Sequence, residues 1–278
     1  MLINYGFSIT LSVTQPTPIL TRLDVVPDRR ADIAEEGRFM MSGADVAAPN
    51  LDVFGNHCRR IVLAPGDTKL ELTGIIRDSG QHERQLRDEP LQPVQALPDE
   101  VLPFLVASRY CESDILSAEA WQLFGKYPET AARVRAIVDF AHAWLTFGYP
   151  YARDTRTAAE AMRERVGVCR DFAHLTIALC RAMNIPARYV NGYLGDIGVP
   201  VDPAPMDFSA WVEVFVGGRW YTVDARHNEP RIGRIVIARG RDAADVPMVH
   251  SFGAHVLKQF MVVTDEIADS AGALRRAA

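Results

Sequence analysis

A short segment, Gly167–Phe172, followed by an apolar run to Met183, constrains this chain more than any other feature. Its sequence, Gly-Val-Cys-Arg-Asp-Phe, is typical of a turn that delivers a cysteine to the first turn of a buried helix. The unpaired N–H groups at a helix start and the positive end of the helix dipole both stabilise an anion. We therefore expect Cys169 to favour the thiolate, the reactive form of cysteine.

A second segment, Asp207–Trp211, leads into a predicted β-hairpin. The pair Gly217-Gly218 separates two alternating apolar runs, which is a strong hairpin signal. A two-residue loop there places four side chains on one face: Ser209, Trp211, Asp224 and Arg226. A histidine at position 209 would then lie near Asp224 and complete a set of cysteine nucleophile, base and orienting acid. The chain has Ser209 at that position.

Three segments carry a family resemblance: Gly167–Phe172, Asp207–Trp211 and Trp220–Ala225. Their order resembles the transglutaminase-like superfamily, a branch of the papain-like cysteine enzymes, over about residues 105–265. The resemblance implies an α+β fold in which a helix carrying the cysteine packs on an antiparallel sheet. The strand-rich region before this core looks like the β domain that precedes it in bacterial members.

The resemblance also implies thiol chemistry on amides, as in a peptidase, amidase or transamidase. It places the nucleophile at Cys169 and the orienting acid at Asp224, and it maps the family histidine to Ser209. General acid–base catalysis is typically worth about 10²–10⁴-fold, and a serine cannot supply it near neutral pH. Two hypotheses stay open: a cysteine-dependent enzyme with impaired chemistry, or a catalytically inactive fold that acts as a binding or scaffold protein.

Four further residues lie near the predicted site. His227 is the possible substitute base: it would point away if the strand continued, and inward if the strand ends at Ala225. His174, on the cysteine helix, is expected to pack in the core. Asp207 and Trp211 are predicted at the substrate rim, although a tryptophan on this face is more often a core residue.

A basic stretch follows Asp224: Arg226, Arg231, Arg234, Arg239 and Arg241. It is either a solvated surface paired with nearby acids or a clamp for a substrate carboxylate. The loop from Gly195 to Pro205 is expected to border the same cleft.

The chain divides by pattern into four parts. Residues 1–88 alternate as strands do, and residues 89–104 form a proline-rich linker. Residues 105–265 make the core, and 266–278 a tail. Within the core, Thr157 is predicted to start a short helix with a capping box, and Gly167 to end it.

Net charge, apolar runs and cysteine spacing exclude several classes of binding partner. A net charge of −5 over 278 residues provides no attraction to nucleic acid or anionic membrane, and no apolar run is long enough to span a bilayer. The four cysteines form no CxxC pair, so we expect no metal site, no cofactor and a cytoplasmic location. The expected substrate is a peptide or protein amide, and the sequence leaves the oligomeric state open.

Overall fold

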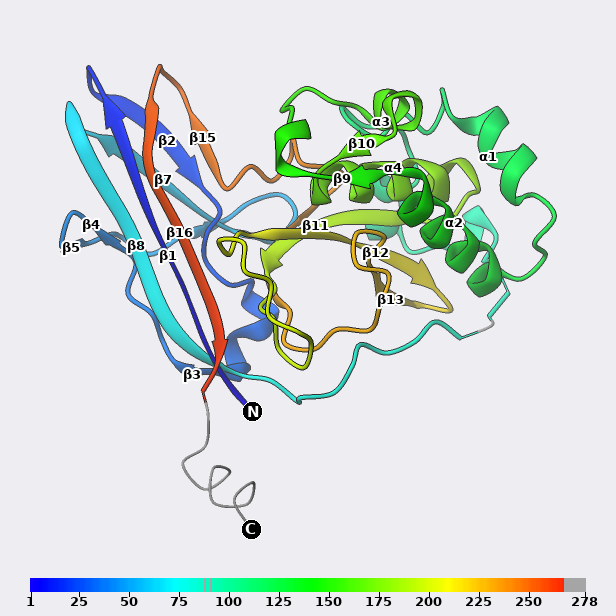
Figure 1. Ribbon diagram of the computed structural model, residues 1–278, viewed down its shortest axis with the longest axis horizontal. Helices are drawn as coiled ribbons and strands as arrows, with labels where there is room; N and C mark the ends of the chain where they lie inside the picture. The colour runs from blue at the N-terminus through cyan, green and yellow to red at the C-terminus, as the bar shows by residue number, and fades with distance from the viewer. Residues whose placement is uncertain (88, 91, 268–278) are drawn as a thin grey trace, which may run out of the picture.

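A long antiparallel sheet forms one side of the molecule (Figure 1). Its strand order is β16-β1-β8-β4-β5, with β3 also paired to β8. The long strands are β1 (Leu2–Val13), β8 (Gly66–Arg77) and β16 (Val256–Glu266), and the short ones are β3 (Ile33–Glu35), β4 (Met40–Met41) and β5 (Ala44–Asp45). Buried residues alternate along β8, so one face of the sheet is apolar. The computed structural model describes residues 1–87, 89–90 and 92–267.

A second antiparallel sheet completes this β-rich part. Its order is β15-β2-β7-β6, with β15 (Val249–Ser251), β2 (Thr17–Thr21), β7 (His57–Leu63) and β6 (Asn50–Leu51). A short 3-10 helix, η1 (Pro27–Asp32), follows β2. Side chains from both sheets, including Phe7, Ile19 and Leu63, are buried in one apolar cluster.

The expected boundary at residue 265 is wrong. Strand β16 pairs with β1 along its length, and β15 pairs with β2, so residues 249–266 belong to the β-rich part and not to the core. A strand pattern shows that a segment is a strand and does not show which distant strand it pairs with. Of the predicted tail, Glu266 ends β16 and Ile267 donates its N–H to the Leu2 carbonyl; residues 268–278 lie outside the described residues.

The connection between the two parts follows residue 77 and crosses the core below its sheet in Figure 1. It contains the 3-10 helices η2 (Val94–Ala96) and η3 (Asp99–Phe104). Leu97 and Val101 pack in a small cluster with Phe215, so the end of the predicted linker is anchored to the core.

The core packs helices against a four-stranded antiparallel sheet of order β13-β12-β11-β14. The strands are β11 (Ala187–Tyr193), β12 (Ser209–Val216), β13 (Arg219–Val223) and β14 (Ile235–Gly240). The helices are α1 (Ser117–Phe124), α2 (Thr130–Trp144), α3 (Ala158–Glu164) and α4 (Cys169–Ala182). Helix α4 lies on β11 and β12 with Leu175, Ile177 and Leu179 fully buried, which confirms the predicted α+β arrangement.

The predicted hairpin register is confirmed between Val212 and Val223, but the ladder ends there, so it does not place Ser209, Trp211, Asp224 and Arg226 on one face. Val216 lies opposite Arg219, and Val212 lies opposite Val223. Gly217 and Gly218 have φ angles of 56° and 79°, a region that glycine adopts without steric cost.

Two short elements precede α4. Strand β9 (Thr146–Phe147) pairs in parallel with β10 (Val166–Gly167), and the 3-10 helix η4 (Tyr149–Tyr151) lies between them in sequence. The capping box at Thr157 is confirmed. Its side chain accepts the backbone N–H of Glu160, and the Glu160 carboxylate accepts the backbone N–H of Thr157.

The sequence predicts that Gly167 ends helix α3, but in the structure it does not. Arg165 does so in the left-handed region, with φ of 58°. A Cβ at position 167 would lie 2.5 Å from the Cβ of Asp171, so glycine is required by close packing. The prediction for Gly167 is therefore wrong: this position needs glycine because of a residue on the next helix, not because it ends α3.

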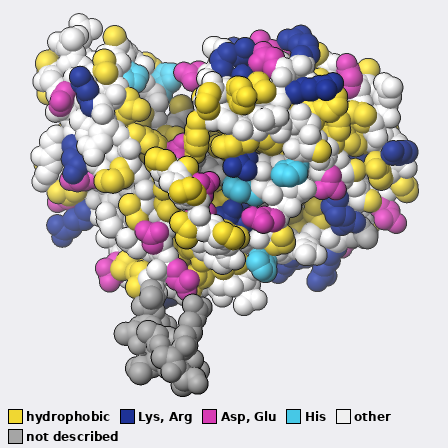
Figure 2. Space-filling view, viewed as in Figure 1, with side chains coloured by type: hydrophobic (Ala, Val, Ile, Leu, Met, Phe, Trp, Pro, Cys, Tyr) yellow, Lys and Arg dark blue, Asp and Glu magenta, His cyan; other side chains and the backbone are white. Residues whose placement is uncertain are grey.

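No helix among the described residues combines the length and apolarity needed to cross a membrane. On the face drawn in Figure 2, acidic and basic side chains are interspersed and do not gather by sign.

Gly167→Ala should destabilise the protein by about 1–3 kcal/mol, because the added methyl group overpacks the Asp171 side chain. The free energy of unfolding in urea measures this. An unchanged midpoint would show that residue 167 does not pack against Asp171.

Candidate functional site

The turn before α4 is held by a buried carboxylate. Asp171, in the first turn, accepts the Val168 N–H at 2.9 Å and a guanidinium N–H of Arg156 at 3.0 Å. The Gly148 N–H donates to the Gly167 carbonyl at 3.1 Å, which ties the β9 segment to the same turn. These contacts fix Cys169 at the helix start, as the sequence had predicted.

The thiol of Cys169 is a weaker acid than the sequence suggested. Burial raises its pKa to about 11, and the carboxylates of Asp207 and Asp224 act in the same direction. The N–H groups of Ala210 and Arg170 lower the pKa, as expected for donors at a helix start, but burial outweighs them. The expectation of a resting thiolate is therefore wrong.

The other buried thiols are weaker acids still. Burial raises the pKa of Cys180 to about 12 and that of Cys111 further. Cys169 is partly exposed, whereas Cys111 and Cys180 are buried, so solvent reaches Cys169 more readily than either of these two.

A cleft of about 280 Å³ opens onto the thiol. Its walls include Tyr149, Cys169, Asp207, Ser209, Arg226 and His227. The loop predicted to border the site does so through residues 196–198, 201–202 and 204–205, and the end of β16 forms another edge. Trp211 is not at the rim: it is 1% exposed and packs with Val190 and Val236, so the rim prediction for this residue is wrong.

His227 is turned back toward the cleft because β13 ends early. The strand stops at Val223, and the Asn228 N–H donates to the Asp224 carbonyl at 2.8 Å, closing a tight turn. Within that turn, Oδ1 of Asp224 accepts the backbone N–H groups of Arg226 at 2.9 Å and His227 at 3.2 Å.

The Asp224 side chain also binds the imidazole. His227 Nδ1 lies 2.9 Å from Oδ2 of Asp224. A carboxylate can only accept, so Nδ1 carries the hydrogen of this contact. The hairpin pattern predicts that Asp224 faces position 209, but in the structure its carboxylate binds His227.

Helix α2 holds the turn from its other side. The Asn228 side-chain amide donates to Asp139 at 2.9 Å, and His142 Nδ1 lies 3.0 Å from the Ala225 carbonyl. His142 thus supports the turn that carries His227.

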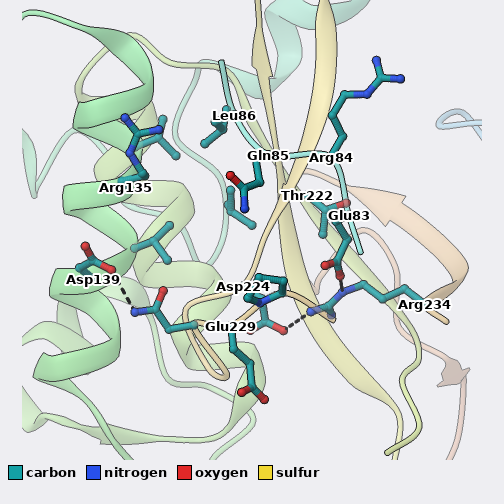
Figure 3. A pocket seen from close by; sticks show the side chains of 15 residues that line it. Glu83, Arg84, Gln85, Leu86, Arg135, Asp139, Thr222, Asp224, Glu229 and Arg234 are labelled. Atoms are coloured by element: carbon teal, nitrogen blue, oxygen red, sulfur yellow. Dashed lines mark hydrogen bonds and ion pairs between the residues drawn. The ribbon is translucent and has the colours of Figure 1, made fainter. Parts of the chain in front are cut away.

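A buried guanidinium completes the arrangement. Arg234 donates from Nη2 to Oδ2 of Asp224 at 2.7 Å, stacks 4.8 Å from the centre of the Trp211 ring, and donates from Nε to Glu83 (Figure 3). Burial alone would raise the pKa of Asp224, but the charge of Arg234 and the contacts with His227 hold it well below its usual value. Asp224 is therefore ionised at neutral pH.

Sequence reasoning missed Glu83 altogether. It lies in the segment after β8, far from the core in sequence, and it also accepts the Arg231 N–H at 2.7 Å. Only the fold brings this carboxylate to the site, so no local pattern could have marked it. The same segment lines a second pocket of about 300 Å³, whose walls also include Asp224 and Arg234 (Figure 3).

Most of the basic stretch is paired with acids. The ion pairs are Arg231 with Asp196, Arg234 with Asp224 and Glu83, Arg239 with Glu213 and Asp28, and Arg241 with Asp245. The interpretation as a solvated surface paired with acids fits Arg239 and Arg241, which are partly exposed, whereas Arg231 and Arg234 are paired but buried.

His174 packs in the core, as predicted. Its ring stacks 5.2 Å from Tyr110, and its Nε2 accepts the Ala243 N–H at 3.2 Å. Burial lowers its pKa well below the usual value, so it is neutral and takes no part in the cleft. Within the described residues, no three His, Cys, Asp or Glu side chains are grouped to hold a metal ion.

Part of this chain matches a known family. The family model described as the transglutaminase-like superfamily matches residues 120–225, from α1 to the turn after β13. The core of this chain has a transglutaminase-like fold. The match includes Cys169, Ser209 and Asp224, while His227 lies just beyond its end.

Two mycobacterial proteins are similar to part of this chain. An uncharacterized protein of Mycobacterium leprae is 37% identical over 92 residues, 31% of this chain and 32% of that one. One of Mycobacterium tuberculosis is 40% identical over 102 residues, 32% of this chain and 31% of that one. The alignments thus span about a third of each relative.

A solved structure shares the whole architecture. A crystal structure described as a "putative cysteine protease" from Cytophaga hutchinsonii superposes with a TM-score of 0.82 and 28% identity, covering 97% of this chain and 92% of that one. Because the coverage is nearly complete, the β-rich part and the transglutaminase-like core occur together in both proteins.

Asp224→Asn should lower the free energy of unfolding at pH 7 by about 1–3 kcal/mol, since Arg234 and the turn lose an ionised acceptor. The folded-state pKa of Asp224 lies below its unfolded value of about 3.9, so this stabilisation is complete above that pH and is lost as pH falls further. Urea titrations at several pH values measure the difference.

The matched control is Asp154→Asn, which removes an exposed carboxylate and should change stability by no more than about 0.5 kcal/mol. A gap between Asp224→Asn and wild type that does not narrow below about pH 4 would contradict the assignment of an ionised Asp224.

Proposed function

We propose that this protein cleaves amide bonds with Cys169 as nucleophile and His227 as general base, oriented by Asp224. The observation that carries the proposal is the 2.9 Å contact between His227 Nδ1 and Asp224, in a turn that places the imidazole on the wall of the cleft that holds Cys169. His227 thus replaces a histidine at position 209.

The proposed reaction begins from a neutral thiol. Because the pKa of Cys169 is about 11, the proton leaves during attack and passes to Nε2 of His227. The sulfur bonds to the amide carbon, and the imidazolium then protonates the departing amine as the C–N bond breaks. Water, activated by the same imidazole, hydrolyses the thioester to a carboxylic acid and restores the thiol.

Asp224 and the backbone have supporting roles in this scheme. The ionised carboxylate keeps the proton on Nδ1 and stabilises the imidazolium that forms. The N–H groups of Ala210 and Arg170 stabilise negative charge at the sulfur. Ser209 lines the cleft without acting as the base.

The proposed substrate is a peptide or protein amide, with water as the acceptor. The four cysteines are free, which fits a reducing compartment, and we place the protein in the cytoplasm on that ground. The alternative, a scaffold without chemistry, is favoured by Ser209 and by the weak acidity of the thiol, and the same experiments separate the two.

His227→Gln should lower amide hydrolysis by about 10²–10⁴-fold, as expected for loss of a general base. Turnover is measured on a pool of peptides by mass spectrometry, with Cys169→Ala as the inactive reference. The matched control is His255→Gln, an exposed histidine outside the cleft, which should retain wild-type turnover.

Equal turnover by His227→Gln and wild type would remove His227 from the mechanism. No turnover by any variant, including wild type, would favour the scaffold.

Ser209→His should lower the pH midpoint for alkylation of Cys169 by iodoacetamide. Position 209 lines the cleft beside Ala210, whose N–H stabilises the sulfur, so an imidazolium there would stabilise the thiolate. Rates read at each cysteine by mass spectrometry measure the midpoint. A folded variant with an unchanged midpoint would mean that residue 209 does not face the thiol.

A further inference from the structure

Arg226 differs from the other arginines of the basic stretch. Among the residues that the structure describes, no carboxylate pairs with its guanidinium, which lies 3.6 Å from the centre of the Phe147 ring. The residue is partly exposed and lines the cleft. A guanidinium stacked on an aromatic ring keeps its in-plane N–H donors free for a planar acceptor.

Backbone contacts fix Arg226 beside the nucleophile. Its N–H donates to Asp224 at 2.9 Å, one residue before His227. Phe147, beneath the guanidinium, is paired with Gly167 in the β9–β10 ladder, directly before the turn of Cys169. Both sides of the stack are therefore tied to the two segments that carry the proposed catalytic residues.

Tyr149 independently places the guanidinium near the thiol. Burial and the charges of Asp207 and Cys169 raise the pKa of its phenol, while Arg226 lowers it. Arg226 and Cys169 are thus both within electrostatic reach of one hydroxyl group in the cleft.

We infer that Arg226 binds a carboxylate of the substrate next to the scissile amide, and so determines specificity for an acidic acyl group. This inference rests on the proposed function, because it names the substrate class of the same site. A paired N–H···O contact between guanidinium and carboxylate gives both geometric specificity and binding energy.

The carboxylates of the cleft leave this guanidinium available. Asp196 pairs with Arg231 at 3.4 Å, and Asp202 and Asp207 accept backbone N–H groups at 2.9 and 2.7 Å. Asp265 and Glu266 are exposed at the end of β16, where salt screens them over about 10 Å at 0.1 M ionic strength.

Two alkylating reagents of nearly equal size test the inference without a known substrate. Iodoacetate carries a carboxylate and iodoacetamide a neutral amide, and each loses iodide to the thiolate of Cys169. The ratio of the iodoacetate rate to the iodoacetamide rate isolates the effect of the reagent's carboxylate, because a change in thiolate fraction affects both rates equally. We expect the ratio at native Cys169 to exceed that at Cys169 in the urea-unfolded chain by about tenfold, the lower end for a hydrogen bond to a charged group.

Variants test whether Arg226 is the side chain that raises the native ratio above the unfolded one. Arg226→Gln should lower the native ratio by about tenfold, and Arg226→Lys, which keeps the charge, should lower it less. Arg219→Gln, which removes an exposed arginine from the hairpin turn, should leave the ratio at the wild-type value. A wild-type ratio equal to that of the unfolded chain overturns the inference, whether or not the Arg226 variants fold.

A second arm distinguishes the source of the carboxylate. Peptides that carry glutamate and an amidated C-terminus are compared with peptides that carry glutamine and a free C-terminus. Faster cleavage of either set than of peptides lacking both carboxylates supports the inference and names the source, and equal cleavage of all sets overturns it. Alkylation does not require turnover. If the proposed function alone fails, no peptide set is cleaved, while the iodoacetate-to-iodoacetamide ratio at native Cys169 still exceeds that of the unfolded chain.

Discussion

The buried carboxylate of Asp224 is the interaction on which the proposed site depends. It is 7% exposed, and it accepts two backbone N–H groups, the imidazole of His227 and the guanidinium of Arg234. Removing a carboxylate from water costs several kcal/mol unless its partners compensate. Meeting that demand closes the turn, ends β13 and directs the imidazole toward the cleft, so one electrostatic requirement sets several features of the backbone.

The acidity of the thiol determines how such a site works. A cysteine with a strongly lowered pKa rests as a thiolate and needs no base for attack. Here burial outweighs the N–H donors, and the pKa of Cys169 is about 11. In the proposed mechanism a neutral thiol must lose its proton during attack, which makes the position of His227 more important than it would be beside a resting thiolate.

Much of the core could be predicted because its determinants are local. The Gly-Gly pair specified the hairpin register, the Thr157 box specified the start of α3, and the position of Cys169 followed from one six-residue motif. His227 could only be offered as an alternative, because its direction depends on whether β13 ends before it. Trp211 was misplaced at the rim because its face of the hairpin is covered by Arg234, and Glu83 was missed because it approaches from another part of the chain.

The pairing of β16 with β1 has a consequence for how this protein is made. Residue 3 lies opposite residue 266, so the β-rich part cannot close until nearly the whole described chain has left the ribosome. Until then the outer edge of β1 stays open to other strands, and such edges are prone to intermolecular pairing. Because contacts this distant in sequence form slowly, assembly should be limited by the last strand and should benefit from chaperones that bind exposed β edges.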